Sequence, residues 1–124
     1  MSEVISDRIV VDMGVCPCPE PPEDIDCGFV GQGLKYSLLI VADGFDMERD
    51  DFKVILACGG KKLEIPKEEM LYGDDDTWYM GIDTGALCAG IVTMTVYAYV
   101  PDDAFKGGVR TEIYNQQLIY LKEV

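Results

Sequence analysis

Hydrophobic and polar side chains alternate along most of this chain, and a period of two is typical of β-strands that bury one face. The clearest run spans residues 91–100, where apolar side chains at Val92 and each later even position alternate with threonines and tyrosines. This run predicts a strand with one face in the core and the other outside it. Trp78 lies on the apolar side of another alternating segment, so we expect it to pack against that core face.

The same alternation predicts further strands at Leu34–Val41, Phe52–Cys58, Lys61–Ile65, Thr77–Asp83 and Arg110–Leu121. Gly59 and Gly60 are expected to form a hairpin turn between two of them. Helical character is confined to residues 66–70, where a proline followed by acidic residues suggests a single turn. Short strands separated by glycine, aspartate and proline turns predict an all-β fold, an immunoglobulin-like antiparallel β-sandwich.

The last of these strands has the least regular pattern. Its core candidates are Ile113, Ile119 and Leu121. The polar residues 115–117 interrupt the alternation between them, and a β-bulge or a bend is expected there.

The N-terminal region has a different character from the rest of the chain. A short apolar run, Ile9, Val10 and Val11, is followed by four prolines between residues 17 and 22. Because proline has no N–H to donate, we expect residues 1–28 to form an extended arm and residues 29–124 the β-sandwich domain. The apolar run is predicted to bind a partner by adding a strand to its sheet edge. The alternative is that it folds back as an edge strand of its own domain.

The length of 124 residues fits one domain, and its charge restricts the partners. There are 23 acidic and 10 basic residues, for a net charge of −13. Such a chain repels nucleic acid and anionic membranes, so neither is an expected partner. The first residues lack the basic and apolar regions of a signal peptide, which predicts folding in a cytoplasm.

Catalysis and cofactor binding find little support in the residue types. The chain has no histidine, which excludes Ser-His-Asp and Cys-His arrangements. The glycine-rich residues 28–33 are not followed by a predicted helix that would present its N-terminus to a phosphate. We therefore expect a protein that is not an enzyme and has no cofactor.

No metal site is predicted either. Cys16, Cys18 and Cys27 lack the usual spacing of zinc ligands. With Cys58 and Cys88 the chain has five cysteines, and an odd number in a chain expected in a cytoplasm favours reduced thiols over disulfides. The acidic segments 43–51 and 74–76 lack the ligand spacing of a calcium loop. We interpret them as solvated turns, with weak ion binding as the alternative.

The outer side of the strand at residues 91–100 is the second candidate for partner binding. Tyr97 and Tyr99, with the neighbouring threonines, form a surface that is both apolar and polar. Tyrosine is enriched at protein interfaces because it buries a large area and keeps a polar group. The alternatives are that a second sheet covers this side or that it is an ordinary solvated face.

Two stretches of the second half of the chain, together with the shorter segments Phe52-Lys53-Val54 and Thr77-Trp78-Tyr79, resemble a β-sandwich domain of virion proteins from tailed phages and prophages of gut bacteria. The two longer stretches carry most of the resemblance. They are Asp83-Thr84-Gly85-Ala86-Leu87-Cys88-Ala89-Gly90, and Pro101-Asp102-Asp103-Ala104-Phe105-Lys106-Gly107-Gly108-Val109-Arg110-Thr111-Glu112. The resemblance does not extend to the proline-rich region.

This resemblance implies a head-fibre or capsid-decoration protein that is made in the host cytoplasm and resides in the virion. Its expected partners are other virion proteins of the capsid, fibre or baseplate, and further copies of itself in a dimer or trimer. The alternatives are a tail-fibre or baseplate attachment protein and a non-viral surface or carbohydrate-binding module.

The same motifs also have a purely structural interpretation. Asp83 and Thr84 can close a turn by hydrogen bonding to nearby backbone. Gly107 and Gly108 permit the positive φ that a chain reversal needs. Arg110 is expected to reach back to Asp102 or Asp103 and hold the loop between the last two strands.

Overall fold

The computed structural model describes residues 8–13, 27–73 and 78–123. This part of the chain forms strands and two short 3-10 helices and contains no α-helix. The strands are β1 (Arg8–Asp12), β2 (Cys27–Phe29), β3 (Gly33–Val41), β4 (Phe52–Cys58), β5 (Lys61–Pro66), β6 (Leu71–Tyr72), β7 (Trp78–Asp83), β8 (Gly90–Pro101) and β9 (Val109–Lys122). The 3-10 helices are η1 (Lys67–Glu69) and η2 (Thr84–Ala86).

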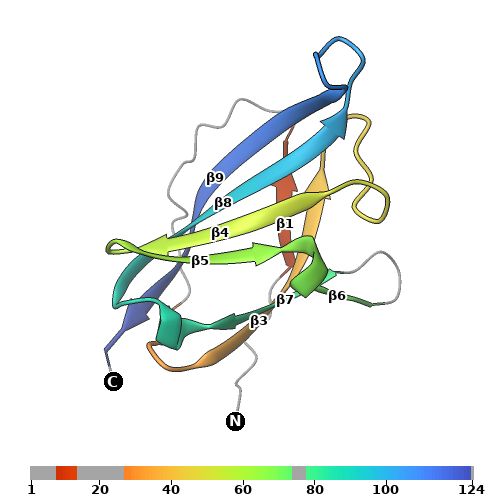
Figure 1. The fold of residues 1–124 in the computed structure, drawn as a ribbon. Coiled ribbons are helices and arrows are strands. Elements are labelled where there is room, and N and C mark those ends of the chain that lie inside the picture. The colour runs from red at the N-terminus through yellow and green to blue at the C-terminus, as the bar shows by residue number, and fades with distance from the viewer. Residues whose placement is uncertain (1–7, 14–26, 74–77, 124) are drawn as a thin grey trace.

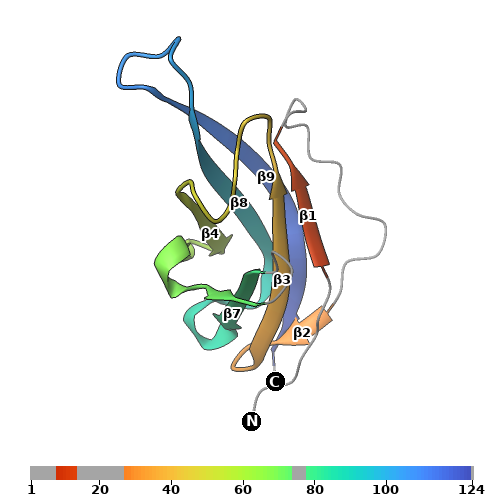
Figure 2. The same cartoon turned by 90° about the vertical axis from the view of Figure 1, so that its right-hand side faces the viewer.

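The strands form two sheets that pack face to face. The smaller sheet has the order β1-β3-β7-β6, and the larger sheet has the order β2-β9-β8-β4-β5. The larger sheet lies in front of the smaller one in Figure 1, and Figure 2 shows both layers after a quarter turn. The predicted all-β sandwich is therefore confirmed. Two pairs, β1 with β3 and β2 with β9, are parallel, whereas the others are antiparallel.

The predicted core face of the long central strand is confirmed. This strand is β8, and all its inward side chains are buried: Val92, Met94, Val96, Ala98 and Val100. Strand β4 lies beside β8 and adds Phe52, Val54 and Leu56 to the same layer. From the smaller sheet, Leu38 and Met80 are fully buried. The alternation works because successive side chains of a pleated strand point to opposite faces.

Strand β9 contains the bulge that its irregular pattern predicts, and because of this bulge one predicted core assignment is wrong. Val92 pairs with Ile119 but Thr93 pairs with Gln117, so Leu118 is the additional residue. An inserted residue reverses which side chains face inward. Ile119 is buried as predicted, but Ile113 is 48% exposed, so its assignment to the core is wrong.

The structure also corrects the prediction for the N-terminal segment. Residues 8–12 form β1, in which Ile9 pairs with Leu38 and Val11 with Ile40. Ile9 and Val11 are buried in the core of their own domain, whereas Val10 between them is exposed. The expected boundary between an arm and a domain is therefore wrong for β1.

The physical reason is that β1 gains apolar burial and backbone hydrogen bonds from β3 without needing a partner. The prolines do not prevent this pairing because they all follow β1 in the sequence. Strand β2 likewise begins at Cys27, inside the predicted arm. The remainder of that arm, residues 1–7 and 14–26, lies outside the described residues.

A buried threonine joins the turn after β2 to the helix η2. Thr84 is fully buried, and its hydroxyl lies 2.7 Å from the Phe29 carbonyl oxygen and 2.8 Å from the Gln32 carbonyl oxygen. The same hydroxyl accepts a hydrogen bond from the Gln32 amide at 2.8 Å. Next to it, the Asp83 carboxylate accepts a hydrogen bond from the Gly85 amide at 2.9 Å. The predicted turn at these two residues is thus confirmed.

Trp78 is buried at the start of β7, as expected. Its ring centre lies 5.7 Å from that of Phe52 on β4 and 5.1 Å from that of Tyr72 on β6. Both pairs meet edge to face, an arrangement that adds to the energy of area burial. The tryptophan therefore connects the two sheets near η1.

The Trp78→Ala variant should lose about 3–5 kcal/mol of the free energy of unfolding, because it leaves a cavity between the sheets. Urea denaturation of both proteins measures this difference. Leu71→Ala is the control, since Leu71 is 71% exposed. A loss below about 1 kcal/mol for Trp78→Ala would contradict the packing described here.

Deletion of residues 1–12 should cost about 3–6 kcal/mol, since it removes Ile9 and Val11, the two buried side chains of β1. The measurement is the same urea titration, applied to the shortened chain. Val10→Ala, which alters an exposed side chain of β1, should change the free energy by less than about 1 kcal/mol. A shortened chain with unchanged stability would show that β1 does not hold the domain together.

Candidate partner-binding surface

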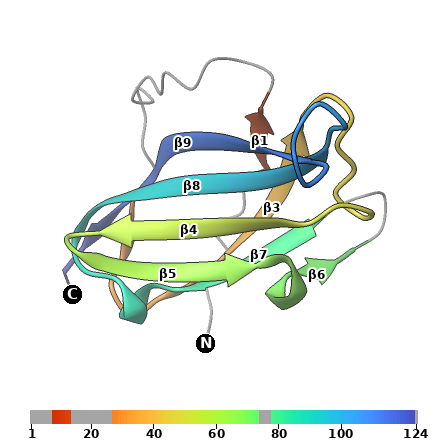
Figure 3. The same ribbon diagram turned by 45° about the horizontal axis from the view of Figure 1, so that its top comes forward.

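The outer side of the larger sheet carries a continuous uncharged surface. It consists of Ile91, Thr93, Thr95, Tyr97 and Tyr99 from β8 and Thr111, Ile113, Asn115, Gln117 and Tyr120 from β9. We call these ten residues the tyrosine face. No other described element covers this side of the sheet in Figure 1 or Figure 3. The alternative that a second sheet covers it is therefore wrong, because the smaller sheet packs on the opposite side.

Cross-strand pairs organise this face. Tyr97 lies between Ile113 on β9 and Lys53 on β4. The Asn115 side-chain amide donates a hydrogen bond to the Thr95 hydroxyl at 3.0 Å. Charged groups begin only at its border, where Lys53 forms a 3.3 Å ion pair with Glu64 of β5. The face thus has an uncharged centre beside a charged margin, the distribution found in many protein interfaces.

The edge of β9 is a second feature of the same region. Strand β2 pairs with β9 only at residues 120–122. Among the described residues, no strand pairs with this edge of β9 along residues 109–119. A strand edge exposes backbone donors and acceptors that another chain can bind.

The loop between β8 and β9 projects beyond the rest of the molecule (Figures 1 and 2). Its backbone is closed by hydrogen bonds from the Asp102 amide to the Gly108 carbonyl at 3.0 Å and from the Gly108 amide to the Phe105 carbonyl at 2.8 Å. Gly107 and Gly108 have φ angles of 99° and 77°, as predicted for this reversal. Phe105 is 48% exposed, so the ordered loop presents an aromatic ring to solvent.

The predicted arginine clamp is present. Arg110 forms a 2.6 Å ion pair with Asp102, rather than with Asp103, and a 2.8 Å ion pair with Glu112. A hydrogen bond from the Ala104 amide, with the Arg110 guanidinium as a further cause, lowers the pKa of Asp102. Arg110 also donates to the Asp43 carbonyl oxygen at 3.3 Å. It therefore holds both its own loop and the neighbouring acidic segment.

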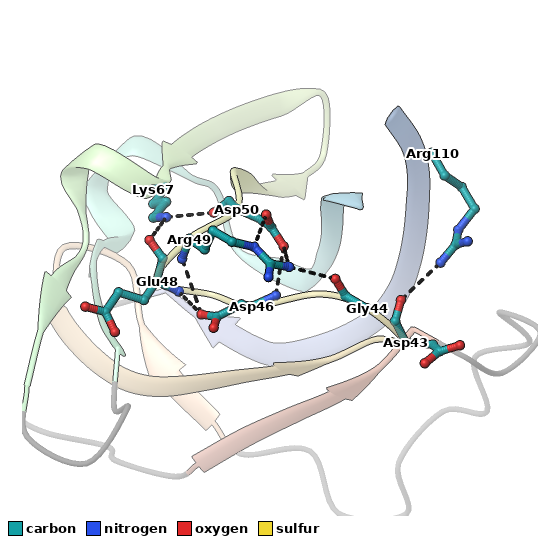
Figure 4. Close-up of polar contacts among 8 residues, drawn as sticks. All are labelled: Asp43, Gly44, Asp46, Glu48, Arg49, Asp50, Lys67 and Arg110. Carbon is teal, nitrogen blue, oxygen red and sulfur yellow. Dashed lines mark hydrogen bonds and ion pairs between the residues drawn. The ribbon is translucent and has the colours of Figure 1, made fainter. Parts of the chain in front are cut away.

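Two carboxylates of the acidic segment 43–51, those of Asp46 and Asp50, form hydrogen bonds within the segment (Figure 4). One Asp46 oxygen accepts hydrogen bonds from the amides of Glu48 and Arg49. The Asp50 carboxylate accepts two bonds from the Arg49 guanidinium, at 2.9 and 2.8 Å. Lys67 donates to the carbonyl oxygens of Glu48 and Asp50 at 2.8 and 2.6 Å. The segment is an ordered loop in which the carboxylates of Asp46 and Asp50 already have donors.

The described residues show no metal centre, and the hollow of the smaller sheet offers no open face of its aromatic ring to a sugar. They contain no group of three or more acidic or cysteine side chains arranged to hold an ion. A shallow hollow of about 370 Å³ lies over Tyr79 and Leu71 on the smaller sheet. The Lys35 ammonium lies 4.3 Å from the centre of the Tyr79 ring, so a cation–π contact already occupies that ring face. Cys16, Cys18 and the acidic residues 74–76 lie outside the described residues.

The sequence-predicted binding residues do not form one site. Tyr97 and Tyr99 are half-buried on the outside of the larger sheet, whereas Val10 is exposed on β1 of the smaller sheet. Sequence reasoning missed Ile113, because the bulge at Leu118 reverses its direction. It also missed Phe105, whose exposure depends on the fold of its loop.

Neither a protein-family model nor a curated protein matches this sequence. No helix of the described residues is long and apolar enough to cross a membrane. The function is therefore inferred from the surfaces of the molecule itself, and first from the tyrosine face.

Stability should decline in acid partly through Asp50. Hydrogen bonding to Arg49 is the main cause that lowers the pKa of the Asp50 carboxyl. Because the folded value lies below the unfolded value of about 4, the stabilisation is complete above that pH and is lost as the pH falls through the folded value.

Urea denaturation between about pH 6 and pH 3 measures this contribution. The stability of Asp50→Asn should fall less steeply than that of the unaltered chain, and at neutral pH it should be lower by about 1 kcal/mol. Asp103→Asn is the matched control, since Asp103 is exposed. Parallel pH profiles for the unaltered chain and Asp50→Asn would contradict the role of this carboxylate.

Proposed function

We propose that this protein is a virion structural component that acts by protein–protein assembly, with the tyrosine face as its main contact surface. The observation that carries the proposal is the absence of charge from all ten positions of that face. Charged residues make up 27% of the chain, which would place about two or three of them in a set of this size. An ordinary solvated face of an antiparallel sheet is polar and charged.

The residue types of the face also favour a protein partner. Tyrosine is enriched at the buried centre of interfaces, where charged residues are depleted. Ile113 and Tyr120 are 48% and 41% exposed, so the face offers apolar area that a partner would remove from water. The small threonines between the aromatic residues keep the surface flat enough for another sheet to pack on it.

Two neighbouring features extend the same contact region. The edge of β9 along residues 109–119 can accept a strand from a partner, which would satisfy its backbone groups. The ordered loop presents Phe105 at the end of β8 and β9, where an aromatic ring can anchor in a partner pocket. Both features require little ordering on binding, which lowers the entropic cost of association.

The net charge of −13 favours partners that bring either positive charge or the same uncharged face. Two copies of the chain repel one another at long range, and salt screens this repulsion. We therefore propose a homo-oligomer, a dimer or trimer, whose formation strengthens with ionic strength. The oligomer would in turn bind a capsid, fibre or baseplate protein.

The virion assignment rests on the resemblance of residues 83–90 and 101–112. Within it, a head-fibre or capsid-decoration role is proposed first, and tail-fibre or baseplate attachment is the alternative. We also propose that the β-sandwich is related to the immunoglobulin-like folds. A non-viral surface or carbohydrate-binding module is less well supported, because Lys35 covers a face of the one aromatic ring that lines the hollow of the smaller sheet.

The assembly role is tested by the native mass of the full chain in solution. We expect a multiple of 13.7 kDa, and the Tyr97→Ala/Tyr99→Ala variant should be a monomer with a melting temperature close to that of the unaltered chain. Tyr79→Ala is the matched control, because Tyr79 is a half-buried tyrosine on the outside of the other sheet. This control should retain the native mass.

A chain that stays monomeric at high concentration and in high salt would exclude self-assembly through this face. The virion role has its own test, which is mass spectrometry of purified phage particles from cells that encode the chain. Absence of the chain from those particles would exclude the virion role. Self-assembly would still be decided separately, by the native mass.

A further inference from the structure

Two cysteines that are far apart in the sequence meet at one end of the larger sheet. Cys58 is the last residue of β4, and Cys88 lies between η2 and β8. Their sulfur atoms are 3.4 Å apart. Each thiol also lies 3.0 Å from the backbone carbonyl oxygen of the other residue, so the contact is reciprocal. Both residues are free thiols in the structure.

A glycine lies close to each cysteine, and the one at position 59 provides the space for this contact. Gly59 has a φ of +55°, and a Cβ atom at this position would collide with the Cys88 sulfur. Gly90 has a φ of +126°, and a Cβ there would lie 3.6 Å from the Cys58 sulfur. Because the two sulfur atoms are only 3.4 Å apart, a small side-chain movement brings them to the bond length of about 2.0 Å in a disulfide.

The two thiols differ in their access to solvent. Cys58 is only 4% exposed, whereas Cys88 lines an open hollow of about 400 Å³ together with Lys61 and Glu123. Burial raises the pKa of the Cys58 thiol, which disfavours its thiolate and so its reaction with an external reagent. Cys88 is therefore placed to react first and Cys58 to react second.

We propose that Cys58 and Cys88 form a redox-active pair that closes to an intramolecular disulfide when a small-molecule disulfide, such as oxidised glutathione, enters the hollow at Cys88. The Cys88 thiolate attacks one sulfur of oxidised glutathione, forms a mixed disulfide and releases one reduced glutathione. The Cys58 thiolate then attacks the Cys88 sulfur and releases the second glutathione. Two protein thiols lose two electrons, and one glutathione disulfide is reduced to two thiols.

The proposal goes beyond the assembly role and does not depend on it. The new bond would join residues 30 positions apart and enclose β5, η1, β6, β7 and η2 in a covalent loop. A cross-link of this length restricts the unfolded chain, so the oxidised protein should melt about 10 °C higher than the reduced one.

The test uses the folded, full-length chain and oxidised glutathione. After reaction, free thiols are alkylated and the protein is digested with trypsin, which cuts after lysine and arginine. Cys58 then lies in the peptide 54–61 and Cys88 in the peptide 68–106, whereas the other three cysteines share the peptide 9–35. We expect mass spectrometry to find peptides 54–61 and 68–106 joined by a disulfide, with the melting temperature raised accordingly.

Single variants test the order of the two steps. Cys58→Ser should trap one glutathione on the peptide 68–106, because the second thiol is missing. Cys88→Ser should leave the peptide 54–61 without glutathione. Cys27→Ser is the control, since Cys27 is exposed and lies outside the pair, and it should form the 54–61 to 68–106 link at the unaltered rate.

The proposal is overturned if both cysteines of the unaltered chain remain open to alkylation after treatment. It is also overturned if the two peptides become linked only when the chain is unfolded in urea, or if each carries a separate glutathione. These outcomes are read from the unaltered chain and therefore do not depend on the folding of any variant.

Discussion

The inward face of β8 is the constraint on which the other features of this structure depend. Strand β8 pairs with β4 on one side and with β9 on the other, and its five inward side chains from Val92 to Val100 are almost completely removed from water. Burial of this size stabilises one orientation of the strand strongly, because a shift by one residue would bring its threonines and tyrosines into the core. Once the inward face is buried, the outward direction of Tyr97 and Tyr99 follows. The candidate binding surface is thus a consequence of how the core forms.

The ends of the sandwich are held by polar contacts between segments that are distant in the sequence. At one end, the buried Thr84 hydroxyl connects η2 to the turn after β2. At the other end, Lys67 binds carbonyl oxygens of the acidic segment, and Arg110 joins that segment to the β8–β9 loop. These contacts order the loops. The exposed Phe105 is therefore carried by a loop with a defined backbone rather than by a flexible one.

The proposed assembly surface and the proposed cysteine pair involve different parts of β8. Cys88 lies just before β8 begins, whereas the loop with Phe105 lies just after β8 ends. A disulfide between Cys58 and Cys88 would restrain the junction of η2, β4 and β8 and leave the tyrosine face uncovered. A protein that folds among reduced thiols and later works in an oxidising medium would gain stability in this way without any change in its contact surface.

The alternation of side chains by itself determined the central strands, because a period of two is a local property. It placed β4 and β8 within one residue at each end and assigned the outer side of β8 to tyrosine and threonine. The two glycines between neighbouring alternating runs predicted the turn at Gly59 and Gly60. The Arg110 clamp was also predictable, since Asp102 lies only eight residues away in the sequence. Only the tertiary structure decided the direction of Ile113, the burial of Ile9 and Val11, and the meeting of Cys58 with Cys88. Each of these depends on register or pairing between distant segments, and the energy of such pairing does not appear in the pattern of either segment alone.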